Sequence, residues 1–229
     1  LMYLAASGVG TLGIMDDDVV DRSNLQRQII HGTADIGRSK VRSAAVRVKD
    51  INPHVETVLY EERAEAENLM EILSKYDFII DAVDSFASKF LINDACVLAK
   101  KPFCHGGIRE FQGQVMTYVP GCGPCYRCIF EEIPADGQID SCSQAGVLGT
   151  MPGIIGSLQA LEAQKYLLGT GDLLTGAMLV FDGLSMEFRK VKFSKASPSC
   201  RVCGEKADIK TLEKSEYEVA AACQWKGKQ

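Results

Sequence analysis

The sequence has no long hydrophobic run. Its apolar stretches are short and interrupted, and none approaches the roughly 18 uncharged residues from which a membrane-spanning helix is built. The first residues match neither a secretory signal peptide nor a transit peptide. We therefore expect a soluble, cytoplasmic protein that has no membrane partner.

An excess of positive charge is also absent. The chain has 25 basic and 30 acidic residues, a net charge of −5 and a sequence pI near 5.3. This balance argues against a nucleic-acid partner, although it is compatible with a local basic pocket. With 46% hydrophobic and 24% charged residues, the 229-residue chain has a globular composition and is long enough to bury a sizeable core.

A glycine-rich phosphate loop is missing as well. A nucleotide-binding half-fold begins with a strand, a glycine turn and a helix, because glycines let the backbone approach phosphate. This sequence opens instead with the pattern of a half-helix that ends at Gly8, and Gly8-Val9-Gly10 precedes a predicted strand rather than following one. There is no initiator methionine. We expect that a strand and its glycine loop precede Leu1 and are missing here.

The cysteines do not form a disulfide framework. Their number, nine, is odd, and no secretory signal accompanies them. Two C-x-x-C pairs supply four thiolates, the complement of a closed tetrahedral zinc site. We predict such a site, with redox pairs or unconnected thiols as the alternatives. Its ligands would be Cys125, Cys128, Cys200 and Cys203.

Hydrophobic periodicity predicts an α/β fold with a mostly parallel sheet that antiparallel strands continue. Strands and helices alternate in the first hundred residues, and glycine-bounded strands follow Pro102. The predicted strands are residues 11–15, 55–60, 77–82, 103–108, 114–119, 177–182 and 187–194, the last two as a hairpin. The predicted helices are residues 41–52, 64–75, 86–100 and 153–169.

The stretch from Asp16 to Lys40 has the features of a nucleotide site. Asp16 ends a predicted strand, where an acidic side chain can bind the hydroxyls of a ribose. Basic residues follow in an otherwise acidic chain, with only Asp35 against them, which suits a triphosphate. The alternative is that Asp16 caps a strand and the cations form a solvated face. These cations are Arg22, Arg27, Arg38, Lys40 and Arg42.

Three further residue types carry hypotheses of their own. Asp84 lies just beyond a predicted strand and before a helix, where a carboxylate can either bind Mg²⁺ or cap the helix. Cys142 follows a polar loop and is a candidate nucleophile, although most lone cysteines are inert. The three histidines, at positions 31, 54 and 105, are scattered singly, and we expect them on loops or the surface rather than as ligands.

Several linked motifs run along the chain: N-L-Q-R-Q at 24–28, G-R-S-K at 37–40, D-A-V-D at 81–84, C-Y-R-C at 125–128, A-G-V-L-G at 145–149, G-S-L-Q-A-L-E-A at 156–163 and the late C-R-V-C. From residue 1 to about 204 their order and spacing resemble those of the ThiF/MoeB/HesA family, the bacterial relatives of ubiquitin-activating enzymes.

This resemblance implies a Rossmann-like adenylation domain that uses ATP to adenylate the C-terminal Gly-Gly carboxylate of a small β-grasp sulfur-carrier protein. It implies that Asp16 binds the ribose and Asp84 binds Mg²⁺. The triphosphate would be bound by Asn24, Arg27 and Lys40, with help from Gln28. The four paired cysteines match the family's zinc ligands, and Cys142 falls where some members carry a cysteine that bonds covalently to the activated carrier.

The resemblance also implies a homodimer, in which an arginine from the partner completes the site, and a separate protein as sulfur donor. We expect one domain over residues 1–204, with a nucleotide-binding part to residue 101 and a zinc and carrier-binding part from 102, then a tail from 205. Without its glycine loop and the N-terminal arginine segment, the chain as written should bind ATP poorly or not at all. Two alternatives are a non-catalytic scaffold that docks a carrier and a nicotinamide oxidoreductase, although hydride transfer requires neither a cation cradle nor four thiolates.

Overall fold

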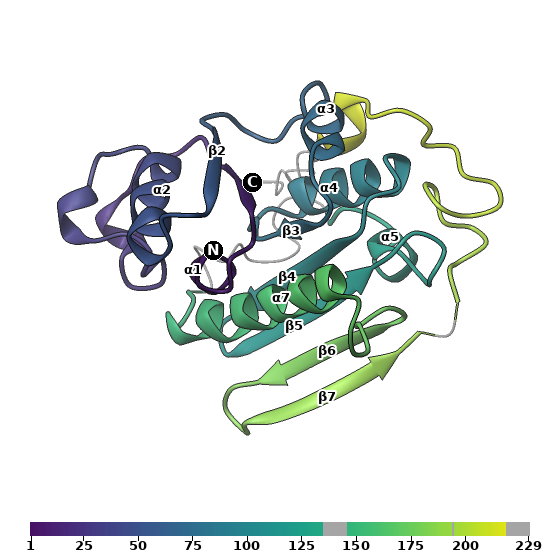
Figure 1. Ribbon diagram of the computed structural model, residues 1–229. Coiled ribbons are helices and arrows are strands. Elements are labelled where there is room, and N and C mark those ends of the chain that lie inside the picture. Colours follow the sequence, from purple (N-terminus) through teal and green to yellow (C-terminus); the bar gives the residue numbers. More distant parts are fainter. Residues whose placement is uncertain (135–145, 194, 219–229) are drawn as a thin grey trace, which may run out of the picture.

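The computed structural model describes residues 1–134, 146–193 and 195–218 (Figure 1). Strands β1 (Thr11–Met15) and β2 (Glu56–Tyr60) form a parallel pair. A second sheet has the order β3-β4-β5-β6-β7. Its strands are β3 (Ile79–Asp81), β4 (Phe103–Arg109), β5 (Gln112–Tyr118), β6 (Ala177–Asp182) and β7 (Glu187–Lys192).

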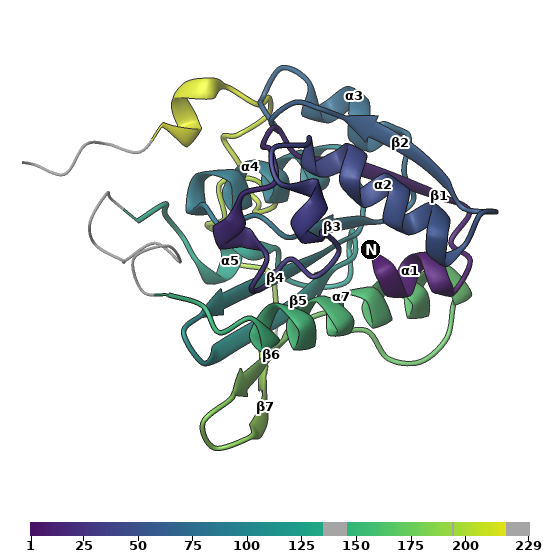
Figure 2. The same ribbon diagram turned by 90° about the vertical axis from the view of Figure 1, so that its left-hand side faces the viewer.

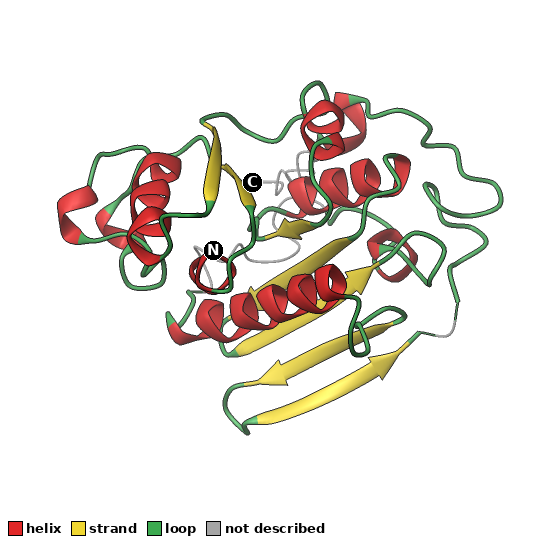
Figure 3. Cartoon of the chain, in the orientation of Figure 1, coloured by secondary structure: helices red, strands yellow, loops and turns green. Residues whose placement is uncertain are grey.

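The sheet is mixed, so the expected mostly parallel sheet is found only in part. β3 pairs with β4 in parallel, whereas β4 through β7 pair in antiparallel fashion. Parallel pairing needs a crossover between strands, and α4 supplies one between β3 and β4. Tight turns join β4 to β5 and β6 to β7, which makes these neighbours antiparallel. The predicted hairpin is therefore confirmed (Figure 3).

The α-helices occupy the expected regions of the chain, apart from the short α5, which was not predicted. The α-helices are α1 (Met2–Ala6), α2 (Lys40–Ile51), α3 (Leu69–Ser74), α4 (Phe86–Leu98), α5 (Tyr126–Ile129) and α7 (Thr150–Leu168). Short 3₁₀ turns are η1 (Arg22–Asn24), η2 (Thr33–Asp35) and η3 (Lys214–Tyr217). Gly169 ends α7 in the left-handed conformation, with φ of 61°. None of the described helices is long and apolar enough to span a membrane.

Helix α3 is shorter than predicted because the Asn68 side chain forms hydrogen bonds with backbone groups of residues 63 and 65, just before the helix. Its side-chain oxygen accepts from the Glu65 amide at 3.0 Å, and its nitrogen donates to the Arg63 carbonyl at 2.8 Å. Such local bonds stabilise a turn in place of a helix. The helix therefore begins only at Leu69.

Helices cover both faces of the five-stranded sheet. Phe103 and Met116 pack with α4, whereas their chain neighbours Cys104 and Val115 pack with Met151 and Ile155 of α7. Successive residues of a strand point to opposite faces, so α4 and α7 lie on opposite sides. Figure 1 shows α7 crossing the front of β4 and β5. A third apolar cluster joins α1, β1 and α2 to Ala160 and Ala163 of α7.

A buried ion pair connects α5 to α4. Arg127 is 4% exposed and Asp94 is fully buried, and the guanidinium binds the carboxylate through Nε and Nη2 at 2.8 to 2.9 Å. The guanidinium also lies over the Phe90 ring, 4.7 Å from its centroid. Burial raises the pKa of Asp94 and outweighs the opposing effect of Arg127. Removing either partner would leave the other charge buried without its counter-ion.

The chain after the second cysteine pair packs against this region. Arg201 forms ion pairs with Asp208 at 2.7 Å and Glu216 at 2.8 Å. The Tyr217 hydroxyl donates to Asp94 at 3.0 Å, and Ile209 is 4% exposed. Residues 205–218 are thus fastened to the body of the protein, an arrangement that their alternating charges did not indicate.

Candidate functional site

The β1 carboxyl end carries a cluster of charges. Asp16 follows the strand, and Lys40, at the start of α2, lies 3.5 Å from Asp16 and 2.7 Å from Asp18. Lys40 is 8% exposed, so its ammonium lies at the inner side of this cluster. Burial lowers the pKa of Lys40, but the two carboxylates raise it overall. Lys40 therefore remains a fixed cation over the physiological pH range.

The next loop carries the other residues predicted for a triphosphate. Asn24 is the last residue of η1, and its side-chain oxygen completes a capping box by accepting from the amide of the N-cap residue Asp21 at 3.1 Å. The Arg27 guanidinium is half-buried and donates to the Ser23 carbonyl at 3.1 Å. The Gln28 amide oxygen is buried and has no hydrogen-bond partner among the described residues. A buried acceptor that lacks a partner costs stability unless a ligand or water satisfies it.

The five cations of this stretch divide into two groups. Arg22 and Arg38 are exposed, and the Arg38 guanidinium pairs with Asp35 at 2.8 Å. Arg42 is also exposed and pairs with Glu61. These three form the solvated face that was the alternative interpretation, while Lys40 is buried and Arg27 is half-buried.

Asp84 lies past the carboxyl end of β3 and is exposed. The interpretation of Asp84 as a helix cap is wrong, because Ser85 takes that role. The Ser85 hydroxyl accepts from the Ser88 amide at 3.1 Å. The Asp84 carboxylate is consequently left at the sheet edge, where a cation can reach it.

The loop with Arg27 and the loop with Asp84 lie along the same edge of the sheet. The Gln26 amide donates to the Val147 carbonyl at 3.4 Å, and Val147 forms a parallel bridge with Glu110. Glu110 follows β4, whose parallel neighbour β3 leads to Asp84. A Cβ at Gly149 would overlap the Gln26 carbonyl, so only glycine permits this contact.

A buried polar network lies beneath this edge and was not expected. Asp81, the last residue of β3, accepts from His105 Nδ1 at 2.7 Å and lies 3.5 Å from the Lys89 ammonium. Lys89 also donates to the Gly106 carbonyl at 2.7 Å, and Gln159 of α7 donates to the Asp81 carbonyl at 2.7 Å. The prediction that His105 lies on a loop or the surface is wrong, because it is fully buried in β4.

The other two histidines agree with the loop or surface assignment, but His31 is 9% exposed and bonds to Ser43 at 2.8 Å. One sequence signal could have revealed the network: His105 lies within a predicted strand, and the preceding predicted strand carries Asp81 near its end. The signal is weak, because sequence alone does not give the register that pairs Asp81 with His105.

Charges in this network are set by burial and by neighbours. Burial raises the pKa of Asp81, but Lys89 and His105 lower it overall, so the carboxylate stays ionised. Burial lowers the pKa of His105, and Lys89 lowers it further. The neutral imidazole then donates from Nδ1 to Asp81, and the Gln114 amide donates to Nε2 at 3.3 Å.

The four paired cysteines come together as predicted. Their sulfur atoms all lie within 4.8 Å of one another, with individual separations between 3.3 and 3.9 Å. A tetrahedron with metal–sulfur bonds of about 2.3 Å has sulfur–sulfur separations of about 3.8 Å. The group therefore has the size and the ligand set of a closed metal site. Its members come from the α5 region (Cys125, Cys128) and the segment after β7 (Cys200, Cys203).

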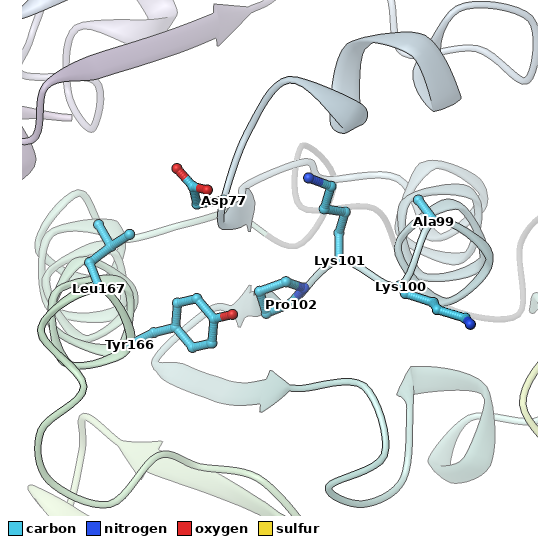
Figure 4. A pocket seen from close by; sticks show the side chains of 7 residues that line it. All are labelled: Asp77, Ala99, Lys100, Lys101, Pro102, Tyr166 and Leu167. Carbon is cyan, nitrogen blue, oxygen red and sulfur yellow. The ribbon is translucent and has the colours of Figure 1, made fainter.

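A surface hollow of about 650 Å³ lies at the other edge of the sheet (Figure 4). Asp77 and Pro102, which line it, precede β3 and β4, so the hollow is at the amino ends of these strands. Lys101, which also lines it, donates to the Ser74 and Tyr76 carbonyls. This hollow is separate from the edge that carries Asp84. Cys142 lies outside the described residues.

The mixed sheet covered by helices on both faces, with charged loops beyond its strands' carboxyl ends, is the architecture of an α/β ligand-binding domain. The chain belongs to the ThiF family, whose family model matches residues 1–202.

Relatives of known name support this assignment. The chain is 43% identical over 222 residues to the SAMP-activating enzyme E1 of Haloferax volcanii, covering 97% of this chain and 81% of that protein. It is 42% identical over 216 residues to the mouse adenylyltransferase and sulfurtransferase MOCS3, covering 94% of this chain and 46% of the relative. The chain thus spans about half the length of the MOCS3 relative.

The fold is shared with a solved structure. The Escherichia coli MccB crystal structure with ATP matches with a TM-score of 0.76 at 20% identity, covering 89% of this chain and 62% of MccB. At this identity the similarity establishes the fold alone.

Proposed function

We propose that this protein is an adenylyltransferase that uses ATP to activate the C-terminal Gly-Gly carboxylate of a small β-grasp sulfur-carrier protein, releasing pyrophosphate. The observation that carries the proposal is the buried Lys40 beside Asp16 at the β1 carboxyl end, together with the half-buried Arg27 on a loop that contacts the β4 end of the sheet edge carrying Asp84, in a member of the ThiF family. The archaeal and mouse relatives are named as an activating enzyme and an adenylyltransferase.

The reaction needs positioning and charge neutralisation rather than a base. A carboxylate oxygen of the carrier bonds to the α-phosphorus, the bond to the β-phosphate oxygen breaks, and pyrophosphate leaves. The carboxylate is already ionised, so no proton has to be removed. Arg27 and Lys40 neutralise the triphosphate, with Asn24 and Gln28 as polar contacts. Asp16 binds the ribose hydroxyls.

The orphaned Gln28 amide supports a ligand in this loop, because a nucleotide hydroxyl or a bound water would donate to its oxygen. The exposed Asp84 carboxylate fits Mg²⁺, since this ion prefers one or two carboxylates together with substrate phosphate oxygens. When bound, Mg²⁺ supplies further neutralisation of phosphate charge. Asp81 stays fixed by His105 and Lys89, which holds the start of the Asp84 loop in place.

The four-cysteine cluster fits structural Zn²⁺, which we assign to it. Four thiolates complete the tetrahedron and leave no position for a substrate, so the metal has a structural role. It clips the α5 region to the segment that follows β7, and so to the carrier-binding part of the domain. The domain is Rossmann-like, with its nucleotide-binding part before residue 102.

The remaining assignments follow from the family. The protein is a cytoplasmic homodimer in which an arginine of the second copy completes the nucleotide site, and a separate protein donates sulfur. In a variant of this function, Cys142 accepts the activated carrier covalently after adenylation. The alternative is a non-catalytic scaffold that binds the carrier.

The test is ATP–pyrophosphate exchange by the full-length protein, with and without a ubiquitin-like protein that ends in Gly-Gly and is encoded by the same genome. We expect exchange that requires the carrier and is reduced about 100-fold or more in Arg27→Ala. The control is Arg38→Ala, which removes an exposed arginine of the same stretch and should leave exchange nearly unchanged. A folded, zinc-loaded protein that shows no exchange with any such carrier would favour the scaffold.

A further inference from the structure

A buried histidine lies on the loop that carries Arg27. His31 is 9% exposed, and its Nδ1 atom lies 2.8 Å from the hydroxyl of Ser43, a residue of α2 that is 2% exposed. Figure 2 shows the segment between β1 and α2 lying beside that helix. The reaction described above gives this pair no part, yet a buried polar contact between two elements fixes how they lie.

On the loop side, the contact continues into the backbone of the predicted phosphate-binding residues. The His31 amide donates to the Gln28 carbonyl at 3.0 Å, and the Gln28 amide donates to the Asn24 carbonyl at 2.8 Å. The Arg27 amide donates to the same Asn24 carbonyl at 3.0 Å. These consecutive bonds make residues 24–31 one compact segment, so a displacement of His31 moves Arg27 and Gln28 with it.

On the helix side, the contact ends one turn from the buried ammonium. Ser43 and Lys40 are three positions apart in α2, so their side chains leave the same face of the helix. Lys40 is itself held by Asp18 at 2.7 Å and by Asp16 at 3.5 Å. The contact between His31 and Ser43 therefore sets where the Arg27 loop lies relative to Lys40.

Within the described residues, two side-chain hydrogen bonds join residues 24–31 to other elements. Besides the His31 contact there is the bond from Gln26 to Val147, which is 3.4 Å long, and Gln26 is exposed. A long bond that is open to water is weaker than a short buried one. Ile30 packs against the cluster formed by α1, β1 and α2, but apolar packing is not directional. His31 is thus the directional link between this loop and α2.

The protonation of the ring decides which side chain could replace it. Burial lowers the pKa of His31, against the effects of Asp35 and Asp16 and with a further lowering from Lys40, so the ring is neutral at pH 7. The Ser43 hydroxyl also forms a hydrogen bond with the Asp35 carboxylate. A hydroxyl has one hydrogen, and a carboxylate can only accept, so His31 Nδ1 carries the ring hydrogen and donates to Ser43.

We propose that His31 is a positioning residue for adenylation: through Ser43 it holds the Arg27 loop against α2, so that the Arg27 guanidinium and the Lys40 ammonium meet the triphosphate together. This role rests on the proposed function and deepens it, because His31 acts through the two cations rather than on the substrates. A shift of about 1 Å in a positioning group can lower the rate about 100-fold.

The test compares the full-length protein with His31→Leu in carrier-dependent pyrophosphate exchange, with ATP and carrier varied separately. Leucine fills much of the space of the ring but cannot donate a hydrogen bond. We expect kcat/KM for ATP to fall about tenfold or more, while the KM for the carrier stays within about twofold. Ser43→Ala should give a similar fall, and the double variant should fall no further than either single one.

His31→Asn is the rescuing variant, because its amide nitrogen takes the place of Nδ1 and donates without a charge. We expect it to return kcat/KM for ATP to within about threefold of the wild type. Val48→Ala is the control for stability, since it removes methyl groups from a fully buried side chain in the last turn of the same helix. It should lower Tm and leave kcat/KM for ATP nearly unchanged.

The outcomes separate this role from the proposed function. Exchange that is unchanged in both His31→Leu and Ser43→Ala would overturn the positioning role and leave adenylation standing, and so would an equal fall in Val48→Ala. If His31→Leu does not fold, Ser43→Ala carries the same expectation. Equilibrium binding of ATP alone that is weakened by His31→Leu, in a protein without exchange, would overturn adenylation and keep the role of His31. A wild type that neither binds ATP nor shows exchange would overturn both.

Discussion

The Arg127–Asp94 ion pair yields a sharp prediction about stability. Asp94→Asn removes the negative charge and leaves the Arg127 guanidinium buried beside Phe90 at 4% exposure. Breaking one side of a buried pair typically costs about 3–5 kcal/mol. We expect a loss of that size in the free energy of unfolding, and a similar loss for Arg127→Met, which leaves the carboxylate alone.

The double variant Asp94→Asn/Arg127→Met should recover most of this loss. Replacing both members of a buried ion pair removes the desolvation cost together with the attraction, so the double variant leaves no charge buried alone. In the wild type, Asn93 and Tyr217 donate to the Asp94 carboxylate at 2.8 and 3.0 Å. In the double variant, the neutral amide at position 94 is still available to these two side chains. We expect it to lie about 1–2 kcal/mol below the wild type, mainly because one amide oxygen replaces two carboxylate oxygens.

Urea unfolding at pH 7, followed by circular dichroism, measures all four proteins as a double-mutant cycle. Arg201→Met is the matched control, because its ion pairs are 43% exposed on the arginine side and should contribute less than about 1 kcal/mol. If Asp94→Asn costs no more than this control, or if the two single effects add up to the double effect, the buried pair is not coupled as described.

Three further predictions concern pH, metal and the unplaced cysteine. Lowering the pH from 7 to 5 should destabilise the protein, because burial holds the pKa of His105 below its ordinary value and the unfolded chain takes up a proton that the folded chain does not. In thermal unfolding, His105→Gln should remove up to about 1.4 kcal/mol per pH unit of this dependence, whereas the exposed His54→Gln should not. Cys203→Ser should lose bound zinc in metal analysis and lower Tm, while Cys122→Ser, near the first cysteine pair, should do neither. Cys142→Ala should leave pyrophosphate exchange intact and affect only later sulfur transfer, and a folded variant without exchange would contradict this.

Much of the fold follows from local patterns in the sequence. The alternation at residues 177–182 and the glycine after Leu168 are local signals, and the hairpin and the end of α7 lie where they indicate. The direction of pairing is less local: short turns make β4–β5 and β6–β7 antiparallel, whereas β5 and β6 pair antiparallel across a long connection that contains α5 and α7. The shortened α3 depends on one side chain, Asn68, whose bonds a periodicity argument does not include.

The site is predictable where it is encoded by types and spacing, and not where it depends on register. The two C-x-x-C pairs predict a metal site from residue type and spacing alone, and the structure brings the four cysteines together. Two buried pairs join separate elements: Asp81 with His105, and Arg127 with Asp94. The local sequence around either member does not indicate which residue is its partner. Sequence therefore indicates candidate ligand-binding residues more readily than it indicates buried pairs between separate elements.

The contact between Gln26 and Val147 has a consequence for the order of assembly. These residues are 121 positions apart, and Gly149 is required for the backbone to pass Gln26. During synthesis the loop that carries Arg27 emerges early, yet it reaches its final surroundings only after the segment leading into α7 has been made. Contacts so distant in the chain are slow to form because a long stretch has to close on itself, so a newly made chain can give the Arg27 loop its final surroundings only once it is complete through α7.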